Sequence, residues 1–454
     1  MKRKNENKSS GKSILILIFF ASLVRILFFL HAPRPVVLPD SLGYFDLGKQ
    51  ILETKNPVHY SRPPVYPLFL SILTELTGDW TAPIYSDQFY RNFTTVVLIQ
   101  SIMGIGSVII VYWLFLELKV REKTTFFLSL LYSGNILIIA SEKSILTESF
   151  ALFLLLVITY FSIQVVKTRR LKDLIILYFI FLLAIFLKPV YLSLPIILLF
   201  ITNLHLRQKK ILLGSILLLI ALIVPVLIYI KGNIFYHKYP GFSRISDFAL
   251  LGQILYYNIP IDQAKGSGYL YDQMTDYRKL KKDPSPFKFL EYYDPQIYSK
   301  PEKQNEITAF NRQVILGNLP LYLFRTLKNL PSGILVNNYI LSYYQTSNNQ
   351  LLIVLFKALL IVSSLIQYLY LISIPGILFI GTYFLFHLSL PIVIPTLIGM
   401  IAGYQLIVTA LGYFEFGRLL VPILPQLFIF SCFCWMVVFG YIKNKLKSFS
   451  LFHR

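Results

Sequence analysis

Five ionisable residues stand at the ends of long apolar segments of this chain, where charge is costly to place: Asp40, Arg62, Glu148, Lys188 and Arg418. If the apolar segments cross a membrane, an ionisable group at the edge of the bilayer core is a candidate functional group by default. A carboxylate among several cations suits chemistry on a phosphate-bearing lipid. The cations would neutralise the phosphate, and the carboxylate would accept a proton.

Two of the five precede apolar helices in the first third of the chain. Asp40 could act as a base or hold a metal ion, or it could instead cap a helix over Ser41–Glu53. Arg62 stands before Pro63 and Pro64, which keep it out of a helix. It could bind a phosphate through its planar guanidinium, or reach toward lipid headgroups.

The other three need partners inside or beside a membrane. Glu148 requires a cation, a metal ion or a water-filled cavity, and a structural ion pair with Lys143 or Lys188 is the simpler alternative. Lys188 could bind phosphate or serve as a turn lysine whose side chain reaches toward water. Arg418 opens an apolar run and requires an anionic partner. We expect Glu142, by contrast, to be solvated.

Composition defines the class of protein. Of the 454 residues, 56% are hydrophobic and 14% are charged, and mean hydropathy is +0.63. Soluble domains have about 25% charged residues. We therefore predict an all-α polytopic membrane protein. The net charge of +21 lies mostly in short loops beside apolar runs, so it does not indicate nucleic acid.

Ten membrane spans are predicted from runs long enough to cross a core of about 30 Å. They cover Ser13–Leu30, Phe93–Leu116, Thr124–Ala140, Ile145–Val166, Leu174–Leu187, Val190–Asn203, Ile211–Ile230, Ser364–His387, Leu390–Leu411 and Leu419–Ile442. The two spans around Lys188 and Pro189 are short, as in broken helices. Residues Gln350–Val362 are expected to form an interfacial or half-buried helix, although a second span within 350–387 remains an alternative.

Basic residues alternate along the chain in a way that orients it. They concentrate at residues 2–12, 119–123, 167–172, 207–210 and 443–454. The positive-inside rule then places both termini in the cytoplasm and the five ionisable residues near the outer face. Composition favours a bacterial inner membrane.

Three parts are expected. Residues 1–230 form a membrane module whose first outer loop covers 31–92, residues 231–350 form a long outer segment, and residues 351–454 form a second membrane module. Within the outer segment, Ile307–Leu330 has amphipathic spacing and residues 256–302 look irregular.

The order of these motifs resembles the GT-C superfamily of glycosyltransferases, of the type that includes protein O-mannosyltransferases and lipid A aminoarabinose transferases (family 39-like). The resemblance rests on Asp40-Ser41 with Tyr44, Arg62-Pro63-Pro64-Val65 with Tyr66, Thr147-Glu148-Ser149, Leu187-Lys188-Pro189, and Arg418 with Pro422 and Pro425. The family usually has a second acid where this chain has Ser41, and a lysine where it has Arg62.

The resemblance implies a GT-C-type bundle and an envelope glycosyltransferase that moves a hexosyl or pentosyl group. The donor would be a polyprenyl-phosphate-linked sugar and the acceptor a lipid, glycan or protein. It implies that Asp40 and Glu148 are catalytic, that Arg62, Lys188 and Arg418 bind the donor phosphate, and that Tyr44 and Tyr66 bind substrate. No metal ligands are assigned, and a divalent cation stays open as a cofactor.

Two other functions fit the same charge pattern. A transporter or flippase of a lipid-linked anion also places basic groups around broken helices. An O-antigen-type polymerase or ligase would use similar positions with a larger acceptor.

Overall fold

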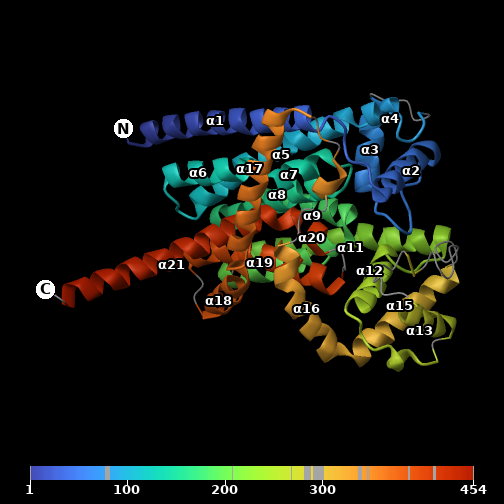
Figure 1. Cartoon of the computed structure of the whole chain (residues 1–454). Coiled ribbons are helices and arrows are strands. Elements are labelled where there is room, and N and C mark those ends of the chain that lie inside the picture. Colours follow the sequence, from blue (N-terminus) through green and yellow to red (C-terminus); the bar gives the residue numbers. More distant parts are fainter. Residues whose placement is uncertain are drawn as a thin grey trace.

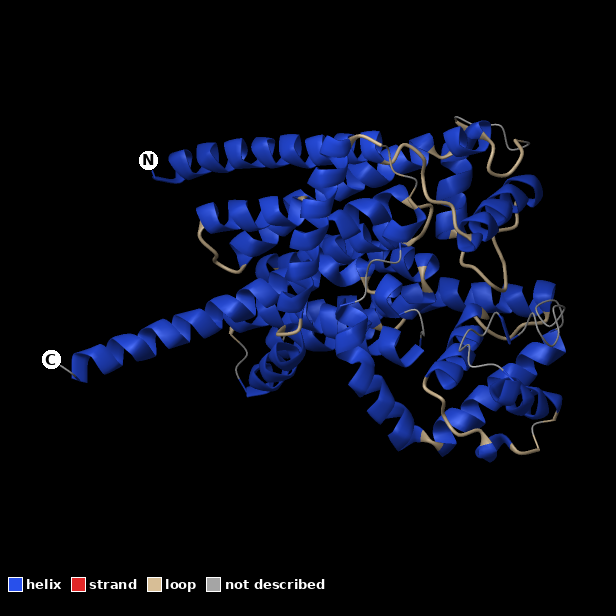
Figure 2. Cartoon of the chain, in the orientation of Figure 1, coloured by secondary structure: helices blue, strands red, loops and turns tan. Residues whose placement is uncertain are grey.

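The computed structural model of the protein consists of helices joined by loops, and the residues that it describes contain no strand (Figure 2). The described residues are 2–76, 82–206, 208–266, 268–280, 288–289, 301–335, 340–344, 346, 348–386, 389–412 and 416–452.

The first half of the chain forms α1 (Lys2–His31), α2 (Pro39–Thr54), α3 (Val65–Glu75), α4 (Asp87–Asn92), α5 (Thr94–Glu117), α6 (Glu122–Ser133), α7 (Ile136–Lys143), α8 (Glu148–Thr168), α9 (Leu171–Leu187), the 3₁₀ turn η1 (Pro189–Tyr191), α10 (Leu194–Leu206) and α11 (Lys209–His237). The second half forms α12 (Ile245–Tyr256), η2 (Asp262–Ala264), α13 (Tyr269–Leu280), α15 (Pro301–Gly317), α16 (Leu319–Leu335), η4 (Ile340–Tyr343), α17 (Gln350–Tyr370), α18 (Ser373–Phe386), α19 (Leu390–Gly412), α20 (Phe416–Leu419), η5 (Val421–Ile423) and α21 (Leu424–Phe452).

The apolar helices identify a multi-pass membrane protein. Within the described residues, seven are long and apolar enough to cross a membrane, or eight if the bent pair α6 and α7 is one span. The two short spans predicted around Lys188 are α9, with 17 residues, and α10, with 13. Together these segments correspond to the ten predicted spans.

Two predicted helices have different boundaries in the structure. The span expected over Thr124–Ala140 bends by 49° between α6 and α7, because Asn135 starts a new helix by accepting a hydrogen bond from Leu137 N at 3.1 Å. The division expected after Val362 is also wrong. Helix α17 continues to Tyr370, since nothing before that residue breaks it, and it lies crosswise to α1 and α21 (Figure 1). The predicted end at His387 lies outside the described residues.

The outer segment contains more helix than its sequence predicts. Helix α13 lies within the stretch 256–302 that was expected to be irregular, although residues 281–287 and 290–300 are outside the described part. The amphipathic stretch Ile307–Leu330 is divided between α15 and α16, with Pro320 in the first turn of α16. Helices α12, α13 and α15 share a second apolar core that includes Leu251, Met274 and Phe310.

The two ends of the bundle differ. Both chain termini lie at one end, and α2, α3, α4, α12, α13 and α15 lie at the other (Figure 1). The two segments predicted to be outer, 31–92 and 231–350, thus each have described helices at that end. Since the candidate residues come from the loops and helix ends near this side, the arrangement allows them to meet.

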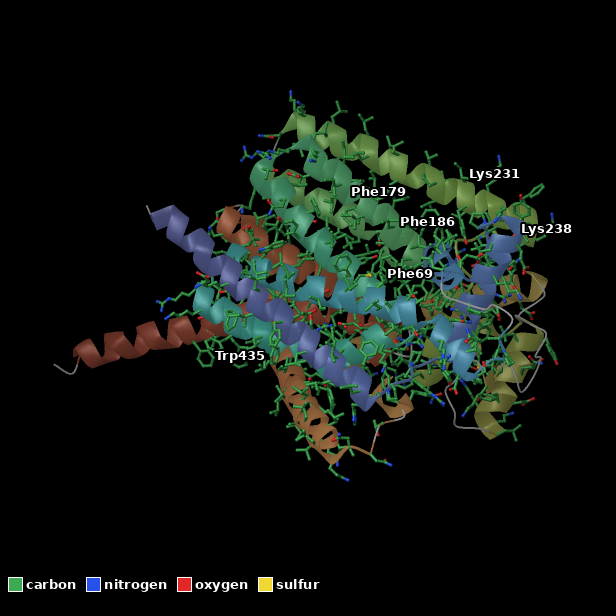
Figure 3. All side chains as sticks on the ribbon, turned by 90° about the horizontal axis from the view of Figure 1, so that it is seen from above. Phe69, Phe179, Phe186, Lys231, Lys238 and Trp435 are labelled. Carbon is green, nitrogen blue, oxygen red and sulfur yellow. The ribbon has the colours of Figure 1, made fainter. Side chains whose placement is uncertain are left out.

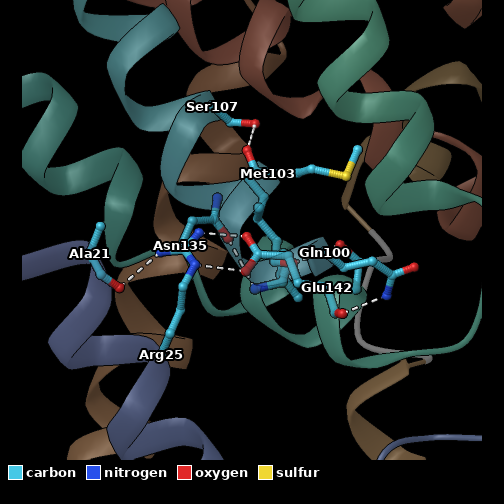
Figure 4. Close-up of polar contacts among 10 residues, drawn as sticks. Ala21, Arg25, Gln100, Met103, Ser107, Asn135 and Glu142 are labelled. Atoms are coloured by element: carbon cyan, nitrogen blue, oxygen red, sulfur yellow. Dashed lines mark hydrogen bonds and ion pairs between the residues drawn. The ribbon is translucent and has the colours of Figure 1, made fainter. Parts of the chain in front are cut away.

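A buried ion pair joins α1 to α7 in the interior (Figure 4). The Arg25 guanidinium donates to both carboxylate oxygens of Glu142, and the two side chains are 4% and 2% exposed. The expectation that Glu142 is solvated is wrong, because a bidentate arginine satisfies it within the core. The neighbouring Lys143 is also buried, with its ammonium 4.5 Å from the centre of the Phe29 ring.

Candidate active site

Asp40 lies in the first turn of α2 with its side chain turned toward two arginines. Its Oδ1 accepts a hydrogen bond from Arg62 at 2.9 Å, and its Oδ2 accepts one from Arg418 at 3.0 Å. The helix begins after Leu38, whose N–H donates to Ser41 Oγ at 2.9 Å. The alternative of Asp40 as the helix cap is therefore wrong. Its carboxylate still gains from the positive end of the helix dipole.

Arg62 is held against α2 by an aromatic ring. Its guanidinium lies over the Tyr44 ring at 4.2 Å from the centroid, and the Tyr44 ring meets Tyr66 edge-on at 5.0 Å. Gly43 leaves room for this arrangement, because a Cβ there would be 3.0 Å from Arg62 Nε. Stacking and a charge-assisted hydrogen bond together fix the guanidinium, so Arg62 is not a side chain that simply extends toward water.

Glu148 is the first residue of α8 and its side chain is 2% exposed. Its Oε1 is 3.3 Å from Lys188 Nζ and 3.7 Å from Arg418 Nε. Its Oε2 has no hydrogen-bond partner among the residues described. Arg418 thus contacts both carboxylates of the site and joins the pair at Asp40 to the pair at Glu148.

The three cations of the site lie at breaks in regular secondary structure. Arg62 precedes two prolines, Lys188 ends α9 in an extended conformation before Pro189, and Arg418 lies in the single turn α20. The turn before Glu148 is anchored by Gln100 of α5, which donates to the carbonyl oxygens of Glu142 and Ser144 at 2.7 and 3.0 Å. The structure thereby brings together all five ionisable residues singled out in the sequence.

The remaining two predicted site residues differ in access to this cluster. Tyr44 is half-buried beside Arg62, whereas Tyr66 is completely buried and its hydroxyl donates to Gln100 Oε1 at 3.0 Å. The Tyr66 ring packs edge-on against Tyr44, which itself stacks on Arg62.

The cluster has three cations and two carboxylates, so it carries a net positive charge. Asp40 is its most accessible carboxylate, with a side chain 33% exposed against 2% for Glu148. Burial by itself would raise the pKa of the Asp40 carboxyl, but Arg418 and Arg62 outweigh it and lower that pKa to about 2. Asp40 is consequently ionised at neutral pH and can accept a proton.

A divalent cation does not fit these residues. The part of the chain that the structure describes contains no group of three His, Cys, Asp or Glu side chains placed to bind a metal ion. Both carboxylates of the cluster already face arginine or lysine, and a dication would be repelled by those neighbours. Arginine and lysine in this number suit a phosphate group instead.

Several supporting residues were not singled out in the sequence. Gly43, Arg25 and Tyr229 bear on the site only through contacts with residues far along the chain, and a single sequence does not contain those distances. Arg25 was the most accessible clue, since an arginine within an apolar span requires a partner.

One protein-family model matches part of the chain. Residues 61–229 match the family model described as dolichyl-phosphate-mannose-protein mannosyltransferase. The match covers fewer than half of the 454 residues. It includes Arg62, Glu148 and Lys188, while Asp40 and Arg418 lie outside it. The match agrees with the resemblance to GT-C glycosyltransferases over this part of the chain, and the predicted all-α polytopic fold class is confirmed by the structure.

Solved structures show distant similarity. An oligosaccharyltransferase from Archaeoglobus fulgidus, tethered with an acceptor peptide, is 13% identical with a TM-score of 0.47, covering 95% of this chain and 50% of its own. ArnT from Cupriavidus metallidurans, bound to undecaprenyl phosphate, is 13% identical with a TM-score of 0.36, covering 89% and 78%. The chain thus spans about half the length of the archaeal enzyme. A comparison with curated protein sequences gives no match.

Proposed function

We propose that the protein is a membrane glycosyltransferase that moves a sugar from a polyprenyl-phosphate donor to a lipid, glycan or protein acceptor. The observation that carries this proposal is the cluster of Asp40, Arg62, Glu148, Lys188 and Arg418, in which Arg418 contacts both carboxylates. The family description, which names a dolichyl-phosphate sugar, supports a lipid-linked donor.

The donor phosphate would be held by Arg62, Lys188 and Arg418. A sugar phosphodiester carries one negative charge, and the lipid phosphate left after transfer carries more. Three cations in a partly buried site would therefore stabilise the leaving group more than the donor, which is how electrostatic catalysis lowers a barrier. The polyprenyl chain would remain among membrane lipids, between apolar helices.

In the proposed reaction an acceptor oxygen forms a bond to the anomeric carbon of the sugar. The bond from that carbon to the phosphate oxygen breaks, and the phosphate leaves with the bonding electrons. The acceptor hydroxyl passes its proton to the Asp40 carboxylate, and attack from the opposite face inverts the anomeric configuration. Glu148 holds Lys188 and Arg418 in place, Tyr44 contacts substrate, and Tyr66 supports Tyr44. No step is routed through a divalent cation.

The site would face the outside of a bacterial inner membrane, with both termini in the cytoplasm. The basic loops support this orientation. Helix α2, which carries Asp40, and α3, which follows Arg62, lie at the end of the bundle away from both termini (Figure 1). We propose that residues 231–350 select the acceptor, since α12, α13 and α15 of this segment pack around a core of their own at that end (Figure 1). Residues 1–230 and 351–454 would form the two membrane modules.

Binding of radiolabelled undecaprenyl phosphate to purified protein in lipid nanodiscs tests the donor site. We expect Arg62→Ala to weaken binding about tenfold or more, because it removes one of three cations from a partly buried site. Lys49→Ala, an exposed lysine of α2, is the matched control and should bind like the unchanged protein. Equal binding by all three proteins would refute the phosphate site.

A further inference from the structure

The hydroxyl of Tyr229 is bonded to the backbone of the segment that carries Arg62. Tyr229 lies on α11 and is 5% exposed. Its oxygen accepts a hydrogen bond from His59 N at 3.1 Å. Its single hydrogen is shared between the carbonyl oxygens of His59, at 2.8 Å, and Arg62, at 3.2 Å. A single side chain thus holds two points of this loop.

The ring of Tyr229 packs beside the segment that carries Lys188. It contacts Phe186 of α9 with ring centroids 5.4 Å apart and Phe242 with centroids 4.9 Å apart, and these two phenylalanines are themselves 5.3 Å apart. Phe186 precedes Lys188 by two residues. Figure 3 labels Phe186 on α9, close to the neighbouring α11 that carries Lys231.

Residues after α11 hold the same loop from a second side. Ser243 donates its hydroxyl to the carbonyl oxygen of Ser61 at 2.6 Å, and Arg244 N donates to that of Tyr60 at 2.9 Å. The Arg244 guanidinium also stacks on the Tyr60 ring at 3.9 Å. The backbone from residue 59 to residue 62 is therefore bonded to α11 and to the segment that follows it.

These contacts matter because two of the three proposed phosphate-binding cations, Arg62 and Lys188, lie outside helices. Arg62 follows an irregular loop, and Lys188 has φ −144° and ψ 120° at the end of α9. Loops keep a fixed geometry only where other groups tie them down. A phosphate site built on two such segments requires something that fixes both, because small displacements of a binding group cost affinity.

We propose that Tyr229 is a positioning residue for the donor phosphate, which fixes Arg62 through its hydroxyl and Lys188 through its ring. This inference rests on the proposed function. Tyr229 does not contact the substrate. It sets the distance between two cations that do, and it couples α9 and α11 to the loop before α3.

The test is donor binding by Tyr229→Phe, which keeps the ring and removes the hydroxyl. We expect undecaprenyl phosphate to bind about fivefold more weakly, because Arg62 is no longer held by these hydrogen bonds, with KM for the donor rising more than kcat falls. Tyr236→Phe is the control, since Tyr236 is an exposed tyrosine of the same helix. Ser243→Ala provides a second variant with the same expected direction if Tyr229→Phe folds poorly.

A double variant shows whether Tyr229 acts through Arg62. Binding by Tyr229→Phe with Arg62→Ala should be no weaker than by Arg62→Ala alone, because the hydroxyl then has no arginine to position. Additive losses would overturn the positioning role, as would unchanged binding by both Tyr229→Phe and Ser243→Ala while Arg62→Ala weakens it. Unchanged binding by Arg62→Ala would instead refute the proposed phosphate site.

Discussion

Gly43 lies on α2 beside the Arg62 guanidinium, and we expect its replacement by alanine to weaken donor binding without weakening the fold. A Cβ at this position would lie 3.0 Å from Arg62 Nε, 3.1 Å from a terminal nitrogen and 3.3 Å from Cζ. These separations are shorter than ordinary van der Waals contacts. The guanidinium must therefore move by a few tenths of an ångström, and we expect it to move away from α2, the helix that carries Tyr44 and Asp40.

The two effects of Gly43→Ala have opposite signs. Alanine is favoured over glycine within a helix by about 1 kcal/mol, and the clash falls on the end of a flexible side chain, so the free energy of unfolding should be unchanged or slightly higher. Displacement of Arg62 weakens its stacking and its ion pair, and each of these is worth about 1 kcal/mol. Donor affinity should accordingly fall about fivefold.

The assay combines thermal unfolding in detergent with undecaprenyl phosphate binding in nanodiscs. Gly440→Ala on α21 is the control, because a Cβ there meets nothing within 4 Å. It should leave affinity unchanged. The reasoning would be refuted if Gly43→Ala bound the donor like the unchanged protein, or if its stability and affinity fell together.

Two further predictions concern the charged groups. Arg418→Gln should raise the pKa of Asp40 from about 2, because it removes a cation that stabilises the carboxylate, while burial continues to raise that pKa. The acid limb of kcat/KM should then fall at a higher pH than in the unchanged protein, and identical acid limbs of the two proteins would contradict Asp40 as the base. Gly104→Ala should destabilise the protein by about 3–5 kcal/mol, because a Cβ would lie 2.0 Å from Glu142 Oε1 and disrupt a buried ion pair. Thermal unfolding measures this loss, and Gly106→Ala, whose Cβ would meet only a ring carbon at 3.2 Å, should lose much less.

Much of the fold follows from local sequence. Long apolar runs predict membrane helices because a helix satisfies its own backbone hydrogen bonds within the bilayer. The helix predicted over Ser41–Glu53 is present as α2. The site residues can be singled out in the sequence because a charge at the edge of a membrane is costly and implies a function or a partner. Asp40 and Arg418 are 378 residues apart in sequence, yet each could be singled out because it stands beside an apolar run.

Other features depend on contacts that a single sequence does not contain. In the sequence, Asn135 could equally be a polar residue within one continuous span, so the bend at this residue is not predicted. The burial of Glu142 depends on Arg25, which lies 117 residues earlier on another helix. Asp40 could be a cap or a base on spacing alone. The start of α2 after Leu38 excludes the cap, and the position of Arg62 and Arg418 beside the carboxylate becomes visible only in the structure.

The most direct test of the account is transfer of radiolabelled sugar from synthetic polyprenyl-phosphate donors to a membrane extract. The purified protein would be compared with Asp40→Asn and with Asp46→Asn, an exposed residue of the same helix. We predict transfer by the unchanged protein and by Asp46→Asn, and a loss of about hundredfold or more in Asp40→Asn with its folded yield unchanged. Equal transfer by all three would contradict Asp40 as the base, and binding of the donor without transfer to any acceptor would contradict a glycosyltransferase.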